Sequence, residues 1–406
     1  MAVSNNAVVE GWANDTAYVY SFAGIDSTKQ YSGIHLKSFR YNTISDKWET
    51  LPDLPDTLGK IAAAASWVDS VIYIIGGYHV FANGNEVSSN KVHRFDTKTN
   101  TFLSDGAPVP VPIDDHVQAV WNDSLIYVIT GWSNNGNVPD VQIYNPSTDS
   151  WLQGTPVPNS NTYKSFGASG TIVGNTIIYF GGANYSFNFP AQANLRIGQI
   201  DPQNPANITW SQSIPNNAFK GYRSACTFSP DGAHWLGGST VTYNYNGIAY
   251  NGNGGVNPVN RNLISFGLSS NLDTAYIGGS SGLPMDLRGI ASFDPYTKYI
   301  VGGMEANQKV SNKTLLLNYV LMPGFNEEVQ NNKLHIFPNP VINEVAIKFN
   351  TKKATYSISD LIGRTYYTGE LNGELTTVNI SGFPSGLGMI TIQEKGKSYQ
   401  KIFVKK

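Results

Sequence analysis

The chain has 406 residues, of which 41% are hydrophobic and only 14% charged, and it is rich in glycine (40), tyrosine (23), phenylalanine (18) and tryptophan (8). This composition excludes a disordered chain and a helix-rich bundle, and it favours a turn-rich β protein. A net charge of −2 provides no cationic field to hold nucleic acid, and the single cysteine, Cys226, excludes an intrachain disulfide framework and a cysteine-based zinc site.

The usual membrane and export signals are missing from the sequence. No run approaches the about 20 apolar residues that cross a bilayer, so we do not expect an integral membrane protein. Residues 1–6 lack the basic and apolar regions of a signal peptide. If the chain is exported, we therefore expect either a processed or truncated form or a route that does not use such a leader.

A short apolar run that ends in a pair of small residues recurs six times along the chain. The pairs are Ala23-Gly24, Gly76-Gly77, Thr130-Gly131, Gly181-Gly182, Gly237-Gly238 and Gly302-Gly303. Successive pairs lie 51 to 65 residues apart, which matches the about 50-residue repeat of four-stranded propeller blades. We expect each pair to occupy positions where a Cβ would clash or where φ is positive.

Each early repeat also carries two aromatic residues seven positions apart. They are Tyr41 and Trp48, Phe95 and Phe102, and Tyr144 and Trp151. Turn-forming residues between them predict an outer hairpin, and a proline soon afterwards predicts a crossing to the next blade. No such crossing follows residues 314–320, so we expect Ala2–Asn5 to supply the outer strand of blade six. An incomplete last blade is the alternative.

The paired glycines after an apolar strand, followed by spaced tyrosine and tryptophan, resemble the kelch repeat. The resemblance covers roughly residues 1–320 and implies an all-β fold, a six-bladed kelch-like β-propeller over residues 1–321. Residues 322–332 are predicted to form a polar linker. The remaining segment, residues 333–406, has ten basic residues against five acidic ones and shows six short strands in the pattern of a small β-sandwich.

The C-terminal segment contains several ordered motifs. They are Ile336-Phe337-Pro338-Asn339-Pro340, the turn over residues 359–364, Gly382-Phe383-Pro384-Ser385-Gly386, and the basic end at residues 401–406. This set resembles the sorting domain of the type IX secretion system of Bacteroidetes-type bacteria. The resemblance implies that residues 333–406 engage the secretion machinery and that the protein is secreted or attached to the outer-membrane surface. A generic partner-binding β-sandwich is the alternative.

The entry to the inner strand of each blade lies on the same face as the loops after the small pairs. Counting back 14 residues from the pair finds Arg288, Arg223 and His116, while Lys164 and Lys60 lie slightly upstream of this register. We predict that these five side chains surround the mouth of the central channel and attract an anionic or polyhydroxy ligand. Alternatively, they form ion pairs with Asp114, Asp115, Asp286 or Glu305 and join the blades. Kelch proteins that capture acidic peptides use arginines at this position, so the resemblance implies a binding role for Arg223 and Arg288.

Aromatic residues are frequent in the loops of that face. The candidates for ligand contact are Tyr78, Trp132, Tyr185, Tyr243 and Tyr245. Aromatic rings beside amides suit sugar rings, which have apolar faces and hydroxyl edges, so we predict a binding module for carbohydrate or an extracellular protein. The alternative is that these rings pack the loops onto the blades.

An enzyme on the same scaffold is the alternative function. A sugar mutarotase or epimerase resembling bacterial kelch sialate epimerases would need an acid and a base, and the candidates are His116, Asp115 and Glu305. We do not expect a copper-dependent oxidase such as galactose oxidase. The six histidines are scattered along the sequence, and Cys226 lies in a run that predicts a buried strand. We therefore expect neither a cofactor nor a metal.

Overall fold

The computed structural model describes residues 1–214, 220–229, 232–259, 262–266, 273–277, 282–318, 334–349, 351, 353–360, 364–371, 373–394 and 397–406. The chain divides into two compact units, Met1–Val320 and Leu321–Lys406. The linker predicted over residues 322–332 lies outside the described residues. Within these ranges the only helices are the short 3-10 turns η1 (Tyr31–Gly33) and η2 (Ala306–Gln308), and no helix is long and apolar enough to cross a membrane.

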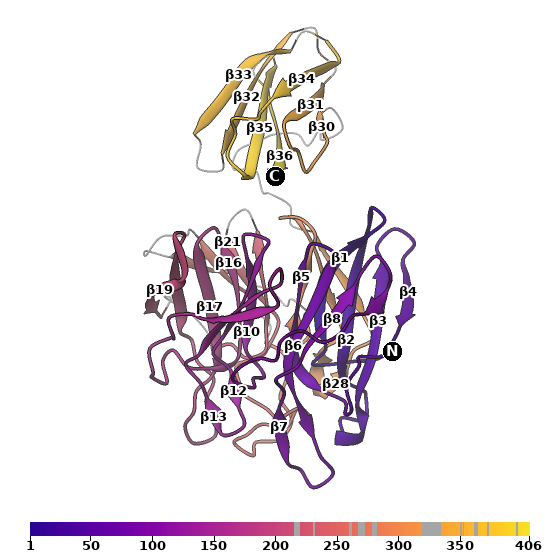
Figure 1. Ribbon diagram of the computed structural model, residues 1–406, viewed down its shortest axis with the longest axis vertical. Coiled ribbons are helices and arrows are strands. Elements are labelled where there is room, and N and C mark those ends of the chain that lie inside the picture. Colours follow the sequence, from indigo (N-terminus) through magenta and orange to yellow (C-terminus); the bar gives the residue numbers. More distant parts are fainter. Residues whose placement is uncertain are drawn as a thin grey trace. The chain divides into compact units, whose positions relative to one another are not determined.

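The first unit is the expected six-bladed β-propeller, built from antiparallel sheets whose strands follow one another in chain order (Figure 1). The first three blades each have four strands. Blade one contains β1 (Ala7–Ala13), β2 (Thr16–Ile25), β3 (Ile34–Asn42) and β4 (Lys47–Leu51). Blade two contains β5 (Ile61–Val68), β6 (Val71–Val80), β8 (Val92–Asp96) and β9 (Thr101–Phe102), and the short strand β7 (Glu86–Ser88) pairs with β6. Blade three contains β10 (Val117–Trp121), β11 (Leu125–Ile129), β14 (Val141–Asn145) and β15 (Ser150–Gln153), with the loop hairpin β12 (Trp132–Ser133) and β13 (Gly136–Asn137).

Blades four and five repeat this order, whereas the sheet of blade six has three strands in the described structure. Blade four contains β16 (Phe166–Val173), β17 (Thr176–Ala183), β18 (Leu195–Asp201) and β19 (Asn204–Ser213); blade five contains β20 (Ala225–Ser229), β21 (Gly232–Leu236), β22 (Asn262–Phe266) and β23 (Asp273–Ile277); blade six contains β25 (Ala291–Ser292), β26 (Thr297–Val301) and β29 (Thr314–Asn318), preceded by β24 (Arg288–Gly289), with the loop hairpin β27 (Met304–Glu305) and β28 (Lys309–Val310). The innermost strands line a central channel. We call the end of the propeller that carries the loops after the small pairs the loop face, and Figure 1 shows β7, β12, β13 and β28 together at that end.

The small pairs connect each blade to the next one. Both residues of all six pairs have positive φ, between 45° and 122°. At Gly76 an added Cβ would lie 2.3 Å from the carbonyl oxygen of Ile113, at the entry to the next blade. The N–H of Gly77 donates to that same carbonyl at 3.0 Å. The equivalent bonds run from Gly24 to Lys60, from Gly182 to Gly221, from Gly238 to Pro284 and from Gly303 to Val3. The predicted reason for small residues at these positions is therefore confirmed.

The ring closes differently from the expectation. Residues Ala2–Asn5 do not form the outer strand of blade six, because Val3 lies between Gly303 and Ser311 on the loop face, near the channel axis. The following strand, β1, is the innermost strand of blade one, and its Ala7 pairs with Arg288 of β24. Side chains complete the closure: Val8, Val19 and Tyr41 of blade one pack with Ala291, Tyr299 and Val301 of blade six.

The second unit is the predicted small β-sandwich. One sheet has three strands, β30 (Leu334–Phe337), β31 (Glu344–Phe349) and β34 (Leu375–Asn379); the other has four, β32 (Ala354–Asp360), β33 (Thr365–Leu371), β35 (Gly386–Glu394) and β36 (Lys397–Lys405). All six predicted strands are present, and β30 is an additional one. Alternating buried residues from both sheets, among them Val345, Ile358, Ile390 and Phe403, form a single core.

Candidate functional site

A ring of left-handed residues surrounds the channel at the loop face. One residue at or just before the start of each inner strand has φ between 47° and 66°: Asn5, Ala62, Asp115, Gly167, Arg223 and Asp286. Backbone hydrogen bonds connect neighbours in this mouth ring, from the Gly167 N–H to the Asp115 carbonyl and from the Arg223 N–H to the Gly167 carbonyl, both at 2.8 Å. A left-handed residue other than glycine is strained, so the mouth ring is held by the surrounding structure.

Buried ion pairs close the channel across this ring. The guanidinium of Arg223 donates from Nη2 and Nε to the two carboxylate oxygens of Asp115, at 2.5 and 3.2 Å, and from Nη1 to Asp286 at 2.9 Å. The hydroxyl of Ser4 donates to the other oxygen of Asp286 at 2.6 Å. All four side chains are 2% exposed or less. The cationic mouth expected from the sequence is therefore a neutralised seal, as in the alternative reading.

The fixed interval of 14 residues before each small pair aligned residues that are not equivalent in the structure. Arg223 precedes its small pair by 14 residues, whereas the equivalent Asp115 and Asp286 precede theirs by 15 and 16. A fixed interval of 14 therefore reached His116 and Arg288, which lie one and two residues further along the chain. His116 adds no charge to the site, because burial and the nearby Arg288 lower its pKa to about 3.

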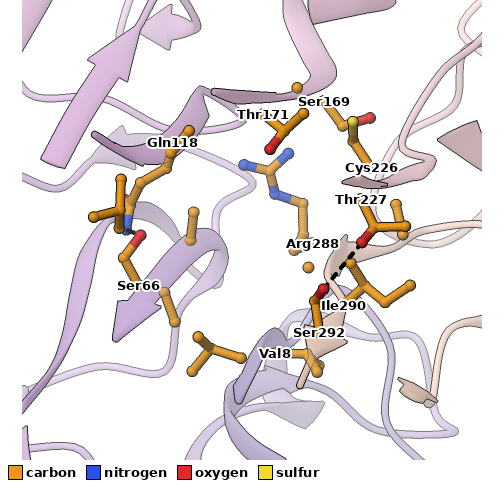
Figure 2. A pocket seen from close by; sticks show the side chains of 18 of the residues that line it. Val8, Ser66, Gln118, Ser169, Thr171, Cys226, Thr227, Arg288, Ile290 and Ser292 are labelled. Atoms are coloured by element: carbon orange, nitrogen blue, oxygen red, sulfur yellow. Dashed lines mark hydrogen bonds between the residues drawn. The ribbon is translucent and has the colours of Figure 1, made fainter. Parts of the chain in front are cut away.

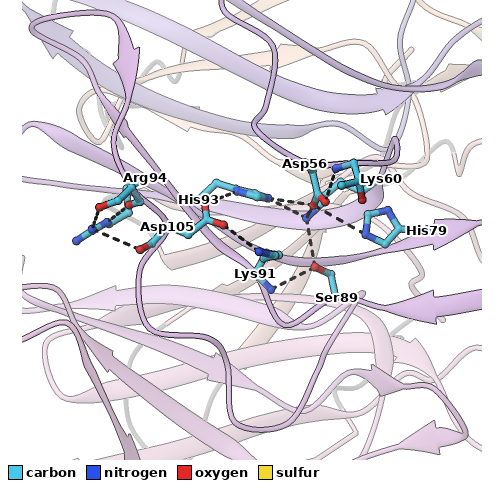
Figure 3. A network of polar contacts seen from close by, with 10 residues as sticks. Asp56, Lys60, His79, Ser89, Lys91, His93, Arg94 and Asp105 are labelled. Atoms are coloured by element: carbon cyan, nitrogen blue, oxygen red, sulfur yellow. Dashed lines mark hydrogen bonds and ion pairs between the residues drawn. The ribbon is translucent and has the colours of Figure 1, made fainter.

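The two lysines do not join the mouth ring. Lys60 is fully buried between blades one and two, where its Nζ lies 2.6 Å from Asp56 and contacts Ser89 and His93 (Figure 3). Burial alone would raise the pKa of Asp56, but the hydrogen bond from His93 and the charge of Lys60 hold it well below its ordinary value. Lys164 is half-buried, and its backbone N–H bonds to Ser160. We therefore assign Lys60 a structural role, in which it holds the crossing segment at Asp56 against blade two.

Arg288 lies inside the channel and not at the loop face. The channel contains a cavity of about 380 Å³, lined by the inner strands of all six blades. Figure 2 shows the side chain of Arg288 in the middle of this space, with Thr171 near its guanidinium and Gln118 on the channel wall beside Ser66. Neighbouring blades also share hydrogen bonds across the channel wall, such as Gln118 to Ser66 at 2.9 Å.

The predicted aromatic contacts divide into buried and exposed residues. Tyr78 and Tyr243 are 4% and 0% exposed, so both pack the loops onto the propeller, as in the alternative reading. Trp132 and Tyr245 are half-buried, whereas Tyr185 is 50% exposed. Tyr185 lies against Trp132 with ring centroids 5.7 Å apart. Trp132 in turn contacts Phe189, and Phe189 contacts Tyr250 of blade five. These rings form one aromatic surface across blades three, four and five.

The most exposed aromatic side chain among the described residues belongs to the loop of blade four. Phe187 is 90% exposed, in the loop between β17 and β18. A bond from Phe189 N–H to the Ser186 carbonyl holds this loop, and both Asn188 and Phe189 have positive φ. Positive φ at a bulky aromatic residue is an outlier that the surrounding contacts must support. The aromatic run Tyr185, Phe187, Phe189 is visible in the sequence, but its exposure depends on this turn.

The catalytic candidates are not arranged as an acid–base set. Asp115 accepts both hydrogen bonds from Arg223, and His116 is buried beside it. Glu305 instead binds Lys313 at 2.9 Å and Ser311, in the loop hairpin of blade six. The pKa of the Cys226 thiol is raised by burial, which opposes nucleophilic use. In the described part of the chain, no group of three His, Cys, Asp or Glu side chains converges to hold a metal ion.

Comparisons with known proteins identify both units. A family model described as the KLHDC2/KLHL20/DRC7 Kelch-repeats domain matches residues 11–245, and a secretion system C-terminal sorting domain matches residues 335–406. Kelch-like protein 36 of Bos taurus is 24% identical over 195 residues, which is 48% of this chain and 29% of that protein. Kelch-like protein terF of Aspergillus terreus is 26% identical over 193 residues, 44% of this chain and 40% of that protein. The matches thus span less than half the length of these relatives.

Among solved structures, the one titled "Structure of YjhT" superposes with a TM-score of 0.62 at 17% identity. The match covers 79% of this chain and 95% of that structure. At this identity the likeness concerns the fold alone.

Proposed function

Because the chain belongs to the kelch-repeat family and ends in a type IX secretion sorting domain, we propose that it is an exported binding module that recognises carbohydrate through the loop face. The sorting domain marks the chain for secretion or attachment to the cell surface. Assignment to a Bacteroidetes-type bacterium, and engagement of the machinery through residues 333–406, belong to the same proposal.

The exposure of Phe187 is the observation that carries this proposal. An aromatic ring that is 90% exposed is unfavourable in an isolated protein, and here the turn at Asn188 and Phe189 holds it outward. Tyr185 presents a second, half-exposed ring on the same loop. The sealed mouth adds no net positive charge from Arg223, because Asp115 and Asp286 compensate it. A neutral ligand with an apolar face, such as a sugar ring, suits this surface.

Exposed aliphatic residues on the same face support a second candidate, an extracellular protein. Val87, Val241 and Ile248 are between 39% and 43% exposed on the loops of blades two and five. Branched aliphatic side chains add contact area for a protein partner but offer no planar surface for a sugar. We propose no catalysed reaction, because Asp115, His116 and Glu305 are occupied by different partners.

The test uses a glycan array followed by calorimetric titration of the purified full chain. Full burial of a phenylalanine side chain contributes about 1.5–3 kcal/mol, and a sugar ring covers only one of its faces. Phe187→Ala should therefore weaken carbohydrate binding by about three- to tenfold, and Tyr185→Ala should act in the same direction. The matched control is Ile44→Ala, which removes an 80% exposed apolar side chain from the outer hairpin of blade one and should change nothing.

The outcomes separate the candidates. An array without a bound glycan, or unchanged affinity in Phe187→Ala, would refute carbohydrate recognition at this loop. If the partner is a protein instead, Val241→Asp and Ile248→Asp should abolish its binding, whereas neither change would greatly affect a sugar held on Tyr185 and Phe187.

A further inference from the structure

The channel cavity has both polar and apolar lining residues, and it reaches the protein surface at the end opposite the loop face. The exposed turn residue Asp123 and the strand-end residues Trp12 and Trp67 belong to its lining. At the other end the ion pairs of Arg223 close it. Its volume of about 380 Å³ lies within the range of small-ligand pockets, and a water molecule takes up only about 30 Å³ of liquid.

Among the described residues that line this cavity, Arg288 is the only arginine or lysine. Its side chain is 4% exposed, and its Nε has no hydrogen-bond partner in the described part of the chain. Nη2 donates to the His116 carbonyl at 2.8 Å, and Nη1 lies 3.5 Å from Asp115. A guanidinium has five N–H donors, so most of its capacity is unused.

Within the described part of the chain, the charge of Arg288 is balanced only through a carboxylate that it shares with Arg223. Asp115 gives both of its oxygens to Arg223 at hydrogen-bond distance, so its contact with Arg288 is the weaker one. Two carboxyl groups among the described residues line the open part of the cavity: Glu10 accepts a bond from the Ser292 N–H, and Asp123 is exposed at the rim. Neither forms an ion pair with Arg288 in the described structure. A buried guanidinium whose nearest carboxylate is shared with another arginine gains from a further hydrogen-bond acceptor, either ordered water or an anionic ligand.

The hydroxyl groups around Arg288 can serve a ligand that accepts and donates hydrogen bonds. Ser169 and Ser224 lie 3.2 Å apart across blades four and five, and Thr227 donates to Ser292 at 3.2 Å across blades five and six. Thr171 borders the cavity near the guanidinium (Figure 2). Each hydroxyl has one donor and two acceptor positions, so these pairs keep capacity for a further bond.

We propose that the channel binds a small organic carboxylate on the guanidinium of Arg288, entering from the end marked by Trp12 and Trp67. The planar carboxylate matches the fork of N–H donors that Arg288 leaves unused. The hydroxyls of Ser169 and Thr171 hold the rest of the ligand. This site is separate from the loop face, because the Arg223 ion pairs lie between the two.

The experiment titrates the full chain with sodium acetate and sodium lactate, with sodium phosphate and sodium bromide as inorganic comparators. A charge-assisted hydrogen bond contributes enough that Arg288→Gln should weaken carboxylate binding by about ten- to hundredfold. Thr171→Phe keeps Arg288 but fills the space before it, and it should also abolish binding. The matched control Phe187→Ala changes the loop face alone and should bind acetate as the wild type does. Melting temperatures of all variants show that each is folded.

Acetate or lactate binding that both channel variants lose and Phe187→Ala keeps would establish the site. A crystal soaked in lactate should show the carboxylate beside Arg288. Three results would each overturn the proposal: no carboxylate binding in the wild type, binding of phosphate or bromide without carboxylate, or equal carboxylate binding in Arg288→Gln. Loss of glycan binding in Phe187→Ala with intact acetate binding would show that the two sites are independent.

Discussion

Replacing Arg223 tests whether the mouth of the channel is a structural seal. Arg223→Gln removes three charge-assisted hydrogen bonds and leaves Asp115 and Asp286, which are 2% and 0% exposed, without their main partner. Breaking a buried ion pair in this way costs about 3–5 kcal/mol. Asp115 keeps its distant contact with Arg288, and Asp286 keeps Ser4 and Asn5, so we expect a loss in the free energy of unfolding of about 4 kcal/mol at pH 7.

The loss should depend on pH with a defined sign. Burial already raises the pKa of Asp286, and the charge of Arg223 opposes that rise. Without Arg223 the folded-state pKa rises further above the unfolded value. A carboxyl group of this kind does not destabilise the fold below its unfolded pKa, and its penalty grows as pH rises toward the folded pKa. The variant should therefore be closer to the wild type at pH 5 than at pH 8.

Tryptophan fluorescence during urea unfolding measures this effect in the full chain. All eight tryptophans lie between Trp12 and Trp235, so the signal reports the propeller and not the sorting domain. The control is Lys313→Gln, which removes an exposed ion pair with Glu305 on the same face and should cost less than about 1 kcal/mol. The double variant Arg223→Gln with Asp286→Asn should recover part of the loss. A change below about 1 kcal/mol in Arg223→Gln, or one equal at both pH values, would refute the seal.

Two further predictions concern backbone strain and a buried lysine. Gly76→Ala places alanine at positive φ and puts its Cβ 2.3 Å from the carbonyl oxygen of Ile113. Its control, Gly84→Ala, also places alanine at positive φ but has no neighbouring atom within 4 Å of the added Cβ. In the same urea assay, Gly76→Ala should therefore lower the free energy of unfolding by about 1–3 kcal/mol more than the control does. Equal losses would contradict the close contact between blades. Burial lowers the pKa of Lys298 in the folded protein to about 8. Between pH 8 and the ordinary pKa of a lysine, the unfolded chain therefore keeps this proton while the folded protein has released it. The free energy of unfolding should rise with pH over that interval. Melting temperatures from pH 7 to 9.5 should show that rise in the wild type and a smaller one in Lys298→Met; identical slopes would exclude this effect.

The repeats made the fold predictable from sequence. At each small pair, the positive φ and the close approach of a neighbouring carbonyl exclude larger side chains. This requirement is local, so the residue types at these positions reveal it. The strands of the sandwich were equally visible, because buried and exposed residues alternate along them. The closure was mistaken because Val3 bonds to the loop face of blade six, and no sequence pattern distinguishes that contact from an outer strand.

The candidate site was less predictable, since its register depends on hairpin length. One or two extra residues in the inner hairpins of blades three and six put Asp115 and Asp286 opposite Arg223, where equal spacing would have put His116 and Arg288. Composition alone also could not tell which tyrosines face solvent. Tyr243 and Tyr185 lie in similar aromatic loops, yet Tyr243 is covered by Tyr222 and Tyr185 is half-exposed.

The hydrogen bonds from the small pairs to the next blade bear on how this protein can diverge. Because these hydrogen bonds hold neighbouring blades together where each loop begins, the rest of the loop can lengthen or shorten without destabilising the propeller. Blade five illustrates this freedom: its insertion from Ser239 to Val259 folds on itself through the Tyr243–Ala249 and Ile248–Gly255 bridges, while the Gly238 bond to Pro284 is kept. Exchanging such an insertion between homologues should transfer recognition while the melting behaviour stays that of the recipient.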